Sequence, residues 1–489
     1  MKISTIPRKT SKSTSKAPAI RLNVPRLECS YLDEPQLEFA NGRQNIDPKL
    51  GILRFGPKSL GDGNRHPSRV RVGLIGTAEG IEVSQGWIDK SSLGVSGDDK
   101  HLEFPGFAPD RGFFAGLDFH QQWTSQITRS EIDDIFARKT KRERFEQLLQ
   151  LLDSKLASLC RKDLPPQYIV LSVPADLYNE CHIVDYNDKT LGQTHRDLRR
   201  AFKALAMRYR IPTQILREKT AKGLDNDHYS KITWNFFTGL YFKAGGFPWA
   251  PVGLLAGTCH LGISFYRSLG SKNPKTCTSM VQAFDEHGQG LVLRGPDFEW
   301  DADREGTNSP HLSEADSARI VELALTQYST ELGQIPKRVV VHKTSRFWEM
   351  EQRGFQSVLG KSVQRYDLVA LHPQNTVRLM PLNNYPALRG TRFSIENLDF
   401  LYTTGFIAEL GQFHGMHVPS PLEIADHIGR DTSRNQILKE ILVLTKMNWN
   451  SAHLGGLLPI TLRFSRLVGN ILKEMPEDIE PLTNYKFYT

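Results

Sequence analysis

This sequence has few cysteines, no long hydrophobic run and no secretion signal. Its cysteines are odd in number and have no close pair, so neither a disulfide framework nor a zinc knuckle is indicated. They are typical of buried thiols in a reducing cytosol: Cys29, Cys160, Cys181, Cys259 and Cys277. No segment approaches the roughly 18 apolar residues of a membrane span, so we expect a cytoplasmic protein without a membrane partner.

A glycine-rich nucleotide loop ending in Lys-Ser or Lys-Thr is also missing, which removes support for an ATPase. The chain has 489 residues, 39% hydrophobic and 24% charged. This composition indicates a globular protein of two domains. The formal net charge of +8 favours polyanionic partners such as nucleic acid. Charge alone is equally compatible with a basic protein that binds none.

The chain divides into an arm, a short strand segment and two larger regions. Residues 1–26 hold seven Lys or Arg and no acid, which predicts a flexible basic arm, either a solvated tail or a nucleic-acid contact. Residues 27–55 are expected to form strands that pack on the second domain or the linker. The two domains are predicted at 56–246 and 247–489, because a Gly-Gly-Phe-Pro-Trp turn at 245–249 separates them.

Hydrophobic periodicity predicts alternating strands and helices in both regions. In the first, we expect strands at 37–39, 52–57, 69–76 and 167–174, and helices at 130–160 and 195–209. In the second, we expect strands at 261–267, 276–284 and 338–343, and helices at 313–332 and 435–444. Strand-helix alternation is typical of α/β sheets with parallel strands.

A cluster of basic and amide side chains begins in the predicted helix 195–209. Arg199 and Lys203 are four residues apart and share a helix face. Gln214 follows at the start of the next strand, and Lys243 comes later, at the end of an apolar helix. Converging Arg, Lys and amide donors suit a terminal phosphate, which carries up to two charges. Taken on charge alone, the same pattern fits a solvated basic helix face.

Two segments near the end of the chain carry a family resemblance. Residues 444–451 read LTKMNWNS, and residues 458–466 read LPITLRFSR. Together they resemble the closing segment of an Argonaute PIWI domain. From about residue 30 onward the chain resembles a short prokaryotic Argonaute. The resemblance implies a Rossmann-like MID domain followed by an RNase H-like PIWI domain.

The resemblance also gives the basic cluster a role. In Argonaute MID domains the guide 5′ phosphate is held by a basic or aromatic residue, a Lys four positions later, a Gln about eleven further on, and a later Lys ahead of a Gly-Gly-x-Pro-Trp turn. Arg199, Lys203, Gln214 and Lys243 match that pattern. In the family the C-terminal carboxylate reaches the pocket through a divalent ion. By position this implies Thr489 as a ligand of Mg²⁺ at the guide phosphate.

Residues that would cut nucleic acid are missing from the matching positions. RNase H-like nucleases hold two divalent ions about 4 Å apart, mainly with carboxylates. The family's ligand positions correspond here to Ser264, to Thr344, and to Arg466 after an expected Leu-Pro-x-Thr strand. A cation repels Mg²⁺. We therefore expect a protein that is not an enzyme and holds no catalytic metal.

Several acids and histidines remain as alternatives. A different alignment would bring Asp285 or Asp367 into the site, and Glu299 or Glu305 lies where a mobile glutamate could sit. The acidic stretch 297–303 lacks the spacing of a calcium loop and is interpreted as a solvated turn. Three histidines in or near predicted core segments are interpreted as structural: His260, His342 and His453.

The resemblance implies a binding module rather than a nuclease. Its partners would be a 5′-phosphorylated small guide RNA, a complementary single-stranded target DNA, and a separate APAZ-containing effector. That effector would be a sirtuin-like or TIR NAD-depleting protein, or a nuclease, acting in defence against plasmids or phage. Two alternatives stay open: a guide-dependent, metal-requiring nuclease that acts alone, and a basic RNase H-like protein without guide specificity.

Overall fold

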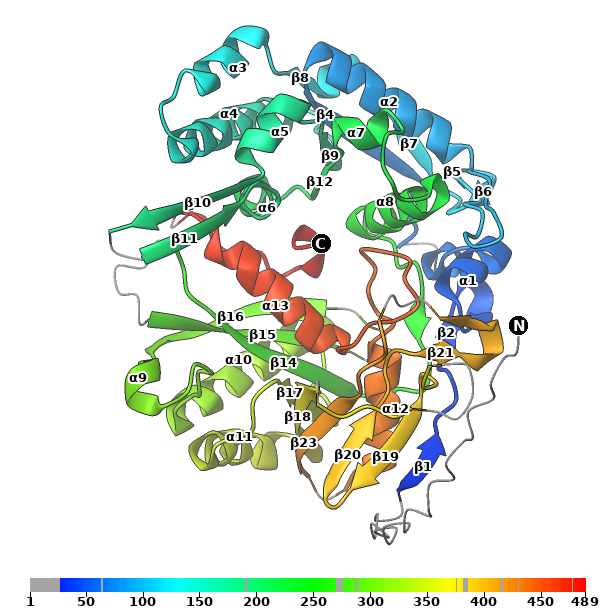
Figure 1. The fold of residues 1–489 in the computed structure, drawn as a ribbon, viewed down its shortest axis with the longest axis vertical. Helices are drawn as coiled ribbons and strands as arrows, with labels where there is room; N and C mark the ends of the chain where they lie inside the picture. Colours follow the sequence, from blue (N-terminus) through cyan, green and yellow to red (C-terminus); the bar gives the residue numbers. More distant parts are fainter. Residues whose placement is uncertain are drawn as a thin grey trace, which may run out of the picture.

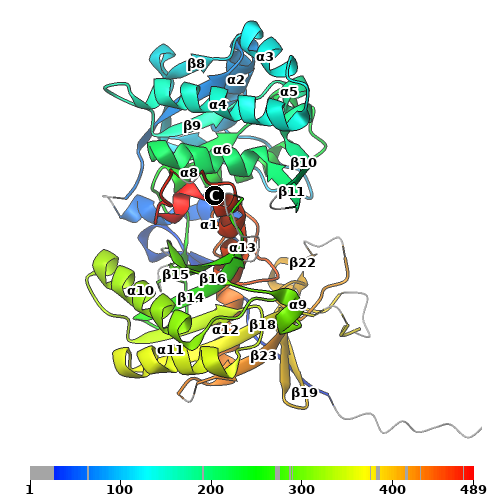
Figure 2. The same cartoon turned by 90° about the vertical axis from the view of Figure 1, so that its left-hand side faces the viewer.

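The computed structural model describes residues 27–489 except 63–64, 190–191, 270–275, 286–287, 289, 375, 381–385, 414–416, 430 and 477. The predicted basic arm 1–26 therefore lies outside the described residues. Figures 1 and 2 show two lobes, one above the other, with helix α13 and the C-terminus between them. Within the described residues, no helix combines the length and the apolarity that crossing a membrane requires.

The upper lobe is built on a sheet of five parallel strands. Its centre is β4 (Arg69–Gly76), which pairs with β9 (Tyr168–Leu171), while β12 (Thr213–Ile215) pairs with β9 on the other side. The remaining two strands, β7 (Gly116–Asp118) and β8 (Thr124–Gln126), also pair with β4. All four residues of β9 are buried, as the apolar run predicts for a strand covered on both faces.

Helices surround this sheet. They are α2 (Ala78–Ser92), α3 (Arg129–Phe136), α4 (Lys141–Cys160), α5 (Ala175–Cys181), α6 (Leu198–Ala206), α7 (Glu218–Ala221) and α8 (Tyr229–Lys243). The helical stretch predicted at 130–160 is two helices, because Thr128 and Thr140 each start a capping box, with Glu131 and Glu143 respectively.

The lower lobe contains a nine-stranded sheet in the order β1-β19-β20-β23-β18-β17-β14-β15-β16. Its central strands β14 (Thr258–Tyr266), β17 (Arg338–Lys343) and β18 (Arg365–Pro373) are parallel. The other strands are β1 (Glu28–Tyr31), β15 (Thr276–Phe284), β16 (Gly290–Glu299), β19 (Thr391–Ile395), β20 (Leu398–Leu401) and β23 (Leu422–Ile428). The strands predicted at 261–267, 276–284 and 338–343 are confirmed.

Successive side chains of β14 point to opposite faces of the sheet, and their contacts show which helices cover each face. Leu261 and Ile263 belong to one core cluster with side chains of α10 (Glu314–Leu332) and α11 (Glu349–Ser362). Gly262, between them, lies against α13 (Ile460–Lys473) on the opposite face, where α12 (Arg434–Leu444) also packs. Successive strand residues point to opposite faces, so Ser264 is directed to the α13 side.

The N-terminal segment joins the lower lobe. Strand β1 extends the large sheet by pairing with β19, and β2 (Leu37–Glu38) pairs with β3 (Gln44–Asn45) and β13 (Ala250–Pro251). The buried Glu34 carboxylate binds Arg389 at 2.7 Å and Lys446 at 2.8 Å. These ion pairs attach Glu34 to the loop before β19 and to the segment that follows α12.

Three sequence predictions of local structure are wrong. Residues 52–55 belong to helix α1 (Pro48–Phe55), because the Asp47 side chain caps the amides of Lys49 and Leu50 and Pro48 occupies the first turn. Residues 192–197 are strand β11 (Gly192–Asp197), which pairs with β10 (Ile183–Asp188), so helix α6 begins only after Asp197. The expected Leu-Pro-x-Thr strand is the start of helix α13, where Pro459 is the N-cap residue.

Short elements complete the fold. They are β5 (Phe107–Ala108), β6 (Arg111–Gly112), α9 (Ala302–Glu305), β21 (Phe406–Ile407), β22 (Gln412–Phe413) and a final 3₁₀ turn at Tyr485–Phe487. The acidic stretch 297–303 forms the end of β16 and the start of α9, where Asp301 caps the helix.

Candidate functional site

Three elements of the upper lobe and the end of the chain meet at one point. Lys203 comes from α6, Gln214 from β12, and Lys243 is the last residue of α8. Figure 1 shows the C-terminus between α6, α8 and α13. The structure therefore brings together residues that are up to 286 positions apart in the sequence.

Each donor at this point has a defined contact. Lys203 Nζ donates to the Thr213 carbonyl oxygen at 3.0 Å and to the main-chain oxygen of Thr489. Lys243 Nζ donates to Gln214 Oε1 at 2.5 Å. Lys203 is only 3% exposed and Lys243 1%, so both ammonium groups are withdrawn from water. Burial this deep normally requires a counter-charge.

The electrostatics of the pocket are unfavourable without an anion. Burial lowers the pKa of Lys203 well below its usual value, and repulsion from Lys243 and Arg199 lowers it further. Burial also lowers the pKa of Lys243, and the charge of Arg199 lowers it further. Within the described residues, neither lysine forms an ion pair with an Asp or Glu side chain. Three cations thus converge on a space where the facing acceptor is the Thr489 main chain.

Arg199 lies at the edge of this pocket. Its side chain still reaches solvent. The surrounding protein nevertheless desolvates the guanidinium and lowers its pKa, an effect that Asp197 partly opposes. A partly exposed cation next to two buried ones suits an anion that enters from solvent.

Tyr168 is a pocket residue that sequence reasoning missed. Its hydroxyl donates to Gln214 Oε1 at 3.5 Å, and Lys243 Nζ lies 5.8 Å from its ring centroid. Burial raises the pKa of this hydroxyl well above the ordinary tyrosine value, so it stays a neutral donor. A tyrosine at the first position of an otherwise aliphatic buried strand is the signal that could have indicated it.

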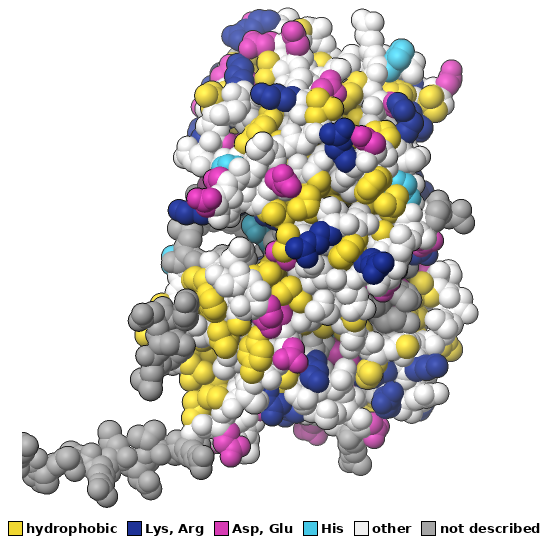
Figure 3. Space-filling view, turned by 90° about the vertical axis from the view of Figure 1, so that its right-hand side faces the viewer, with side chains coloured by type: hydrophobic (Ala, Val, Ile, Leu, Met, Phe, Trp, Pro, Cys, Tyr) yellow, Lys and Arg dark blue, Asp and Glu magenta, His cyan; other side chains and the backbone are white. Residues whose placement is uncertain are grey.

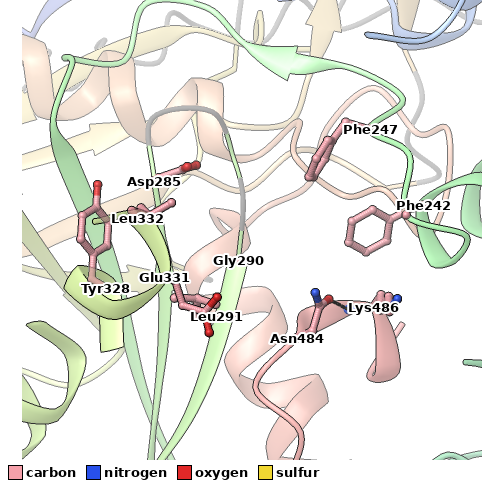
Figure 4. A pocket seen from close by; sticks show the side chains of 11 residues that line it. Phe242, Phe247, Asp285, Gly290, Leu291, Tyr328, Glu331, Leu332, Asn484 and Lys486 are labelled. Carbon is pink, nitrogen blue, oxygen red and sulfur yellow. Dashed lines mark hydrogen bonds between the residues drawn. The ribbon is translucent and has the colours of Figure 1, made fainter. Parts of the chain in front are cut away.

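A separate pocket of about 170 Å³ lies nearby and has a different charge character. Figure 4 shows Asp285 and Glu331 on one side of it, and Asn484 and Lys486 on the other. Two carboxylates in the wall make it unsuitable for a phosphate. The outer face drawn in Figure 3 also offers no continuous basic surface, because Lys and Arg alternate there with Asp and Glu.

The lower lobe brings the other predicted positions to one end of its sheet. Gly262 of β14 pairs with His342 of β17 in parallel register. Ser264 lies two residues beyond Gly262 in β14, and Thr344 directly follows β17, so both positions lie toward the carboxyl ends of neighbouring parallel strands. Arg466 is on α13, which crosses this face of the sheet.

The four alternative acids have defined places in the structure. Asp367 is fully buried and binds Arg338 at 2.8 Å, His427 at 2.9 Å and Thr432 at 2.8 Å. Asp285 lines the small pocket, Glu299 is the last residue of β16, and Arg304 binds Glu305 at 2.6 Å. Among the described residues, one group of three potential metal ligands occurs, Asp98, His101 and His228, and it belongs to the upper lobe.

Two of the histidines interpreted as structural are buried in this lobe. His342 Nδ1 lies 2.8 Å from the Thr461 hydroxyl, and burial lowers the pKa of the ring to about 3, which keeps it neutral. His260 Nε2 lies 3.7 Å from Glu440, whose carboxylate also binds Arg338 at 2.7 Å. These contacts fix β14, β17 and α12 to one another.

Comparison with known proteins gives a match at the level of structure. No family model matches the chain, and no curated protein matches its sequence. Among solved structures, it is similar to Clostridium butyricum Argonaute bound to a guide DNA and a target DNA, with TM-score 0.64 and 16% identity over 93% of this chain. The Argonaute of A. aeolicus gives TM-score 0.58 at 16% identity, and Drosophila Piwi 0.60 at 13%.

The chain has an Argonaute-like fold. It spans about half the length of these structures: 54% of the C. butyricum protein, 54% of the A. aeolicus protein and 56% of Drosophila Piwi. The part it matches is the MID-PIWI portion, so the predicted α/β fold class is confirmed. The upper lobe is called the MID lobe below, and the lower lobe the PIWI lobe.

Proposed function

We propose that the MID lobe anchors the 5′ phosphate of a small guide RNA through Arg199, Lys203, Gln214 and Lys243. The observation that supports this proposal is the convergence of buried Lys203 and Lys243, neither of which has an Asp or Glu partner among the described residues. Burial is the main cause of the lowered pKa of both lysines and repulsion between the cations adds to it; a phosphate dianion would oppose both effects. Charge-assisted hydrogen bonds of this kind are roughly twice as strong as neutral ones.

Mg²⁺ at this point is part of the proposal. The residues fit it only together with the guide, because Thr489 offers main-chain oxygen alone and Lys203 already donates to it. Mg²⁺ keeps several waters and takes one or two carboxylates plus phosphate oxygens. When bound, the ion would neutralise repulsion between the Thr489 carboxylate and the guide phosphate.

The anchored guide would then select a complementary single-stranded DNA by base pairing. Protein contacts would go to the sugar-phosphate backbone and read A-form shape, so the sequence information resides in the guide. The similar C. butyricum structure holds a guide DNA and a target DNA. That observation supports nucleic-acid partners for this chain.

Target recognition without cleavage is the remaining part of the proposal. Ser264, Thr344 and Arg466 offer two hydroxyls and a cation at the end of the sheet where RNase H-like nucleases place carboxylates. The pairing signal would pass to an APAZ-containing effector in a heterodimer. The effector would be NAD-depleting, with a sirtuin-like or TIR domain, or a nuclease, in cytoplasmic defence against plasmids or phage. The support for the effector is the resemblance of the sequence to short prokaryotic Argonautes.

The decisive experiment compares two RNAs that differ only at the 5′ end. The purified protein should bind 5′-phosphorylated RNA at least tenfold more tightly than 5′-hydroxyl RNA, because each 1.4 kcal/mol is about tenfold in affinity. Equal affinities would contradict the guide pocket and favour a generic basic protein. Incubating the guide-loaded protein with complementary DNA and Mg²⁺ or Mn²⁺ tests the rival nuclease function, which requires metal-dependent products.

The effector is tested separately. Co-expression with the product of the adjacent gene should give a stable complex. Addition of matched target DNA to the guide-loaded complex should cause NAD loss or DNA degradation. Absence of both activities with a matched target, in a complex that retains guide, would contradict effector activation while leaving guide binding intact.

A further inference from the structure

The course of α13 places Arg466 relative to the sheet. At the start of the helix, the Thr461 carbonyl oxygen lies so close to Gly262 that an added Cβ would overlap it. Two turns later, a Cβ at Gly469 would lie 3.4 Å from the Cβ of Tyr266. The helix therefore runs along β14 in the direction of the strand, toward its carboxyl end.

The side of α13 that carries Arg466 is fixed by Leu462. Leu462 belongs to the core cluster that contains Val340 of β17 and Leu371 of β18. Residues four apart lie on the same helix face, so Arg466 is one turn beyond Leu462 on the side that faces these strands. One turn advances about 5.4 Å along the axis, toward the end of β17 that Thr344 follows.

Arg466 is an unpaired charge at this place. Its side chain is exposed, and within the described part of the chain no carboxylate forms an ion pair with it. Strand β23, on the far side of β18, carries two acids: Asp426 is bound by Arg346 at 2.8 Å and Glu423 by Gln374 at 2.7 Å. Arg338, deeper in the same lobe, is instead held by two carboxylates. The unpaired guanidinium is therefore available to an external anion.

Ser264 supplies a second, independent feature. Its hydroxyl oxygen is buried and has no hydrogen-bond partner among the described residues. Leaving a buried hydroxyl unpaired costs roughly 1–3 kcal/mol, so a water molecule that reached it would stabilise this end of the sheet. The hydroxyl is directed to the α13 side of the sheet, toward the carboxyl end of β14.

We propose that Arg466 binds a backbone phosphate of the guide-target duplex beside Ser264 and Thr344. The guanidinium would supply, as a fixed side chain, the positive charge that metal ions supply in a cutting RNase H-like site. The exposed hydroxyl of Thr344 would donate to an oxygen of the same phosphate, and Ser264 beneath it supplies no carboxylate. The site thus becomes a clamp for the paired duplex, and this inference rests on the proposed guide function.

Salt dependence of target binding tests the clamp. The guide-loaded protein is titrated with fluorescent complementary DNA at several salt concentrations. Each phosphate contact contributes about 0.9 to the slope of log affinity against log salt for double-stranded DNA. Arg466→Gln should lower the magnitude of the slope by about one relative to the parent, and Arg466→Lys should largely restore it. At low salt, Arg466→Gln should bind target severalfold more weakly.

Arg319→Gln is the matched control. Arg319 is an exposed arginine of α10, on the opposite face of the sheet, and it also lacks an ion pair within the described residues. If Arg466→Gln and Arg319→Gln give the same slope and affinity, the clamp is refuted. Binding of 5′-phosphorylated guide RNA should be equal in both variants and the parent.

The two proposals fail in different ways. If the parent does not distinguish 5′-phosphorylated from 5′-hydroxyl RNA, the guide function itself is wrong. If the parent makes that distinction and Arg466→Gln behaves like the control, the guide function stands and the clamp alone is rejected.

Discussion

Removal of the Lys243 charge should separate guide binding from stability. Lys243→Met keeps the length and most of the volume of the side chain at a buried position. The variant loses one charged hydrogen bond to the guide phosphate, worth about 1.5–3 kcal/mol. At 1.4 kcal/mol per tenfold, affinity for phosphorylated RNA should fall by about 10- to 150-fold.

Stability of the guide-free protein should change little. The parent buries Lys243 beside Lys203 and Arg199, and this burial lowers the pKa of the amine. Replacing buried charged groups with apolar groups of similar volume is often neutral or stabilising by about 1–4 kcal/mol. The lost bond to Gln214 Oε1 costs about 1–3 kcal/mol. Because the two effects nearly cancel, the free energy of unfolding should stay close to that of the parent.

Two measurements on the same samples test the predicted loss of guide affinity and the predicted stability of Lys243→Met. Fluorescence anisotropy gives the affinity for 5′-phosphorylated RNA, and urea unfolding gives the stability. Lys222→Met is the control, since Lys222 is a partly exposed lysine of the same lobe that pairs with Glu79 at 3.0 Å, and such pairs contribute about 0–1 kcal/mol. If Lys243→Met binds phosphorylated RNA like the parent, the pocket is assigned wrongly. If it loses both binding and stability, the repulsion argument fails.

Three further outcomes are expected. Guide affinity should fall as pH rises toward the ordinary lysine pKa of about 10.4, because burial lowers the pKa of both pocket lysines and the phosphate-bound state holds more protons; anisotropy that does not vary with pH would contradict this. The Ser264→Asp, Thr344→Asp double variant should not cut target DNA while Arg466 remains, and any metal-dependent product on a gel would overturn that expectation. Gly262→Ala should lower the unfolding free energy by about 1–3 kcal/mol, because the new Cβ overlaps the Thr461 carbonyl oxygen; an unchanged urea midpoint would refute this contact.

The elements that were predicted well from the sequence are those whose hydrophobic pattern and boundary residues all lie within the element itself. The strand predicted at 69–76 coincides with β4, and the strand at 338–343 with β17. Both strands are largely apolar and bounded by turn or charged residues. A strand that is buried on both faces has this continuous apolar pattern, so it can be predicted from its own residues without knowing which strands it pairs with. Helix α10 is likewise within one residue of its predicted start.

The wrong predictions occur where a helix cap or packing against another element determines the secondary structure. Residues 52–55 are apolar enough for a strand, but the capping side chain of Asp47 begins a helix five residues earlier. Residues 460–466 resemble a strand in composition. In the folded chain they form the start of α13, which lies against β14 through Gly262. Local composition does not distinguish these cases, because tertiary packing overrides weak propensities.

The sequence by itself determined the types and spacing of Arg199, Lys203, Gln214 and Lys243, and it places Ser, Thr and Arg at 264, 344 and 466. It could not determine that the two lysines are buried without an Asp or Glu partner, or that Tyr168 and the Thr489 main chain join them. Only the tertiary structure decided this, since burial and repulsion depend on distances between segments far apart in the chain. For the same reason, the register of β14 with β17 and the course of α13 show that Ser264, Thr344 and Arg466 share one end of the sheet.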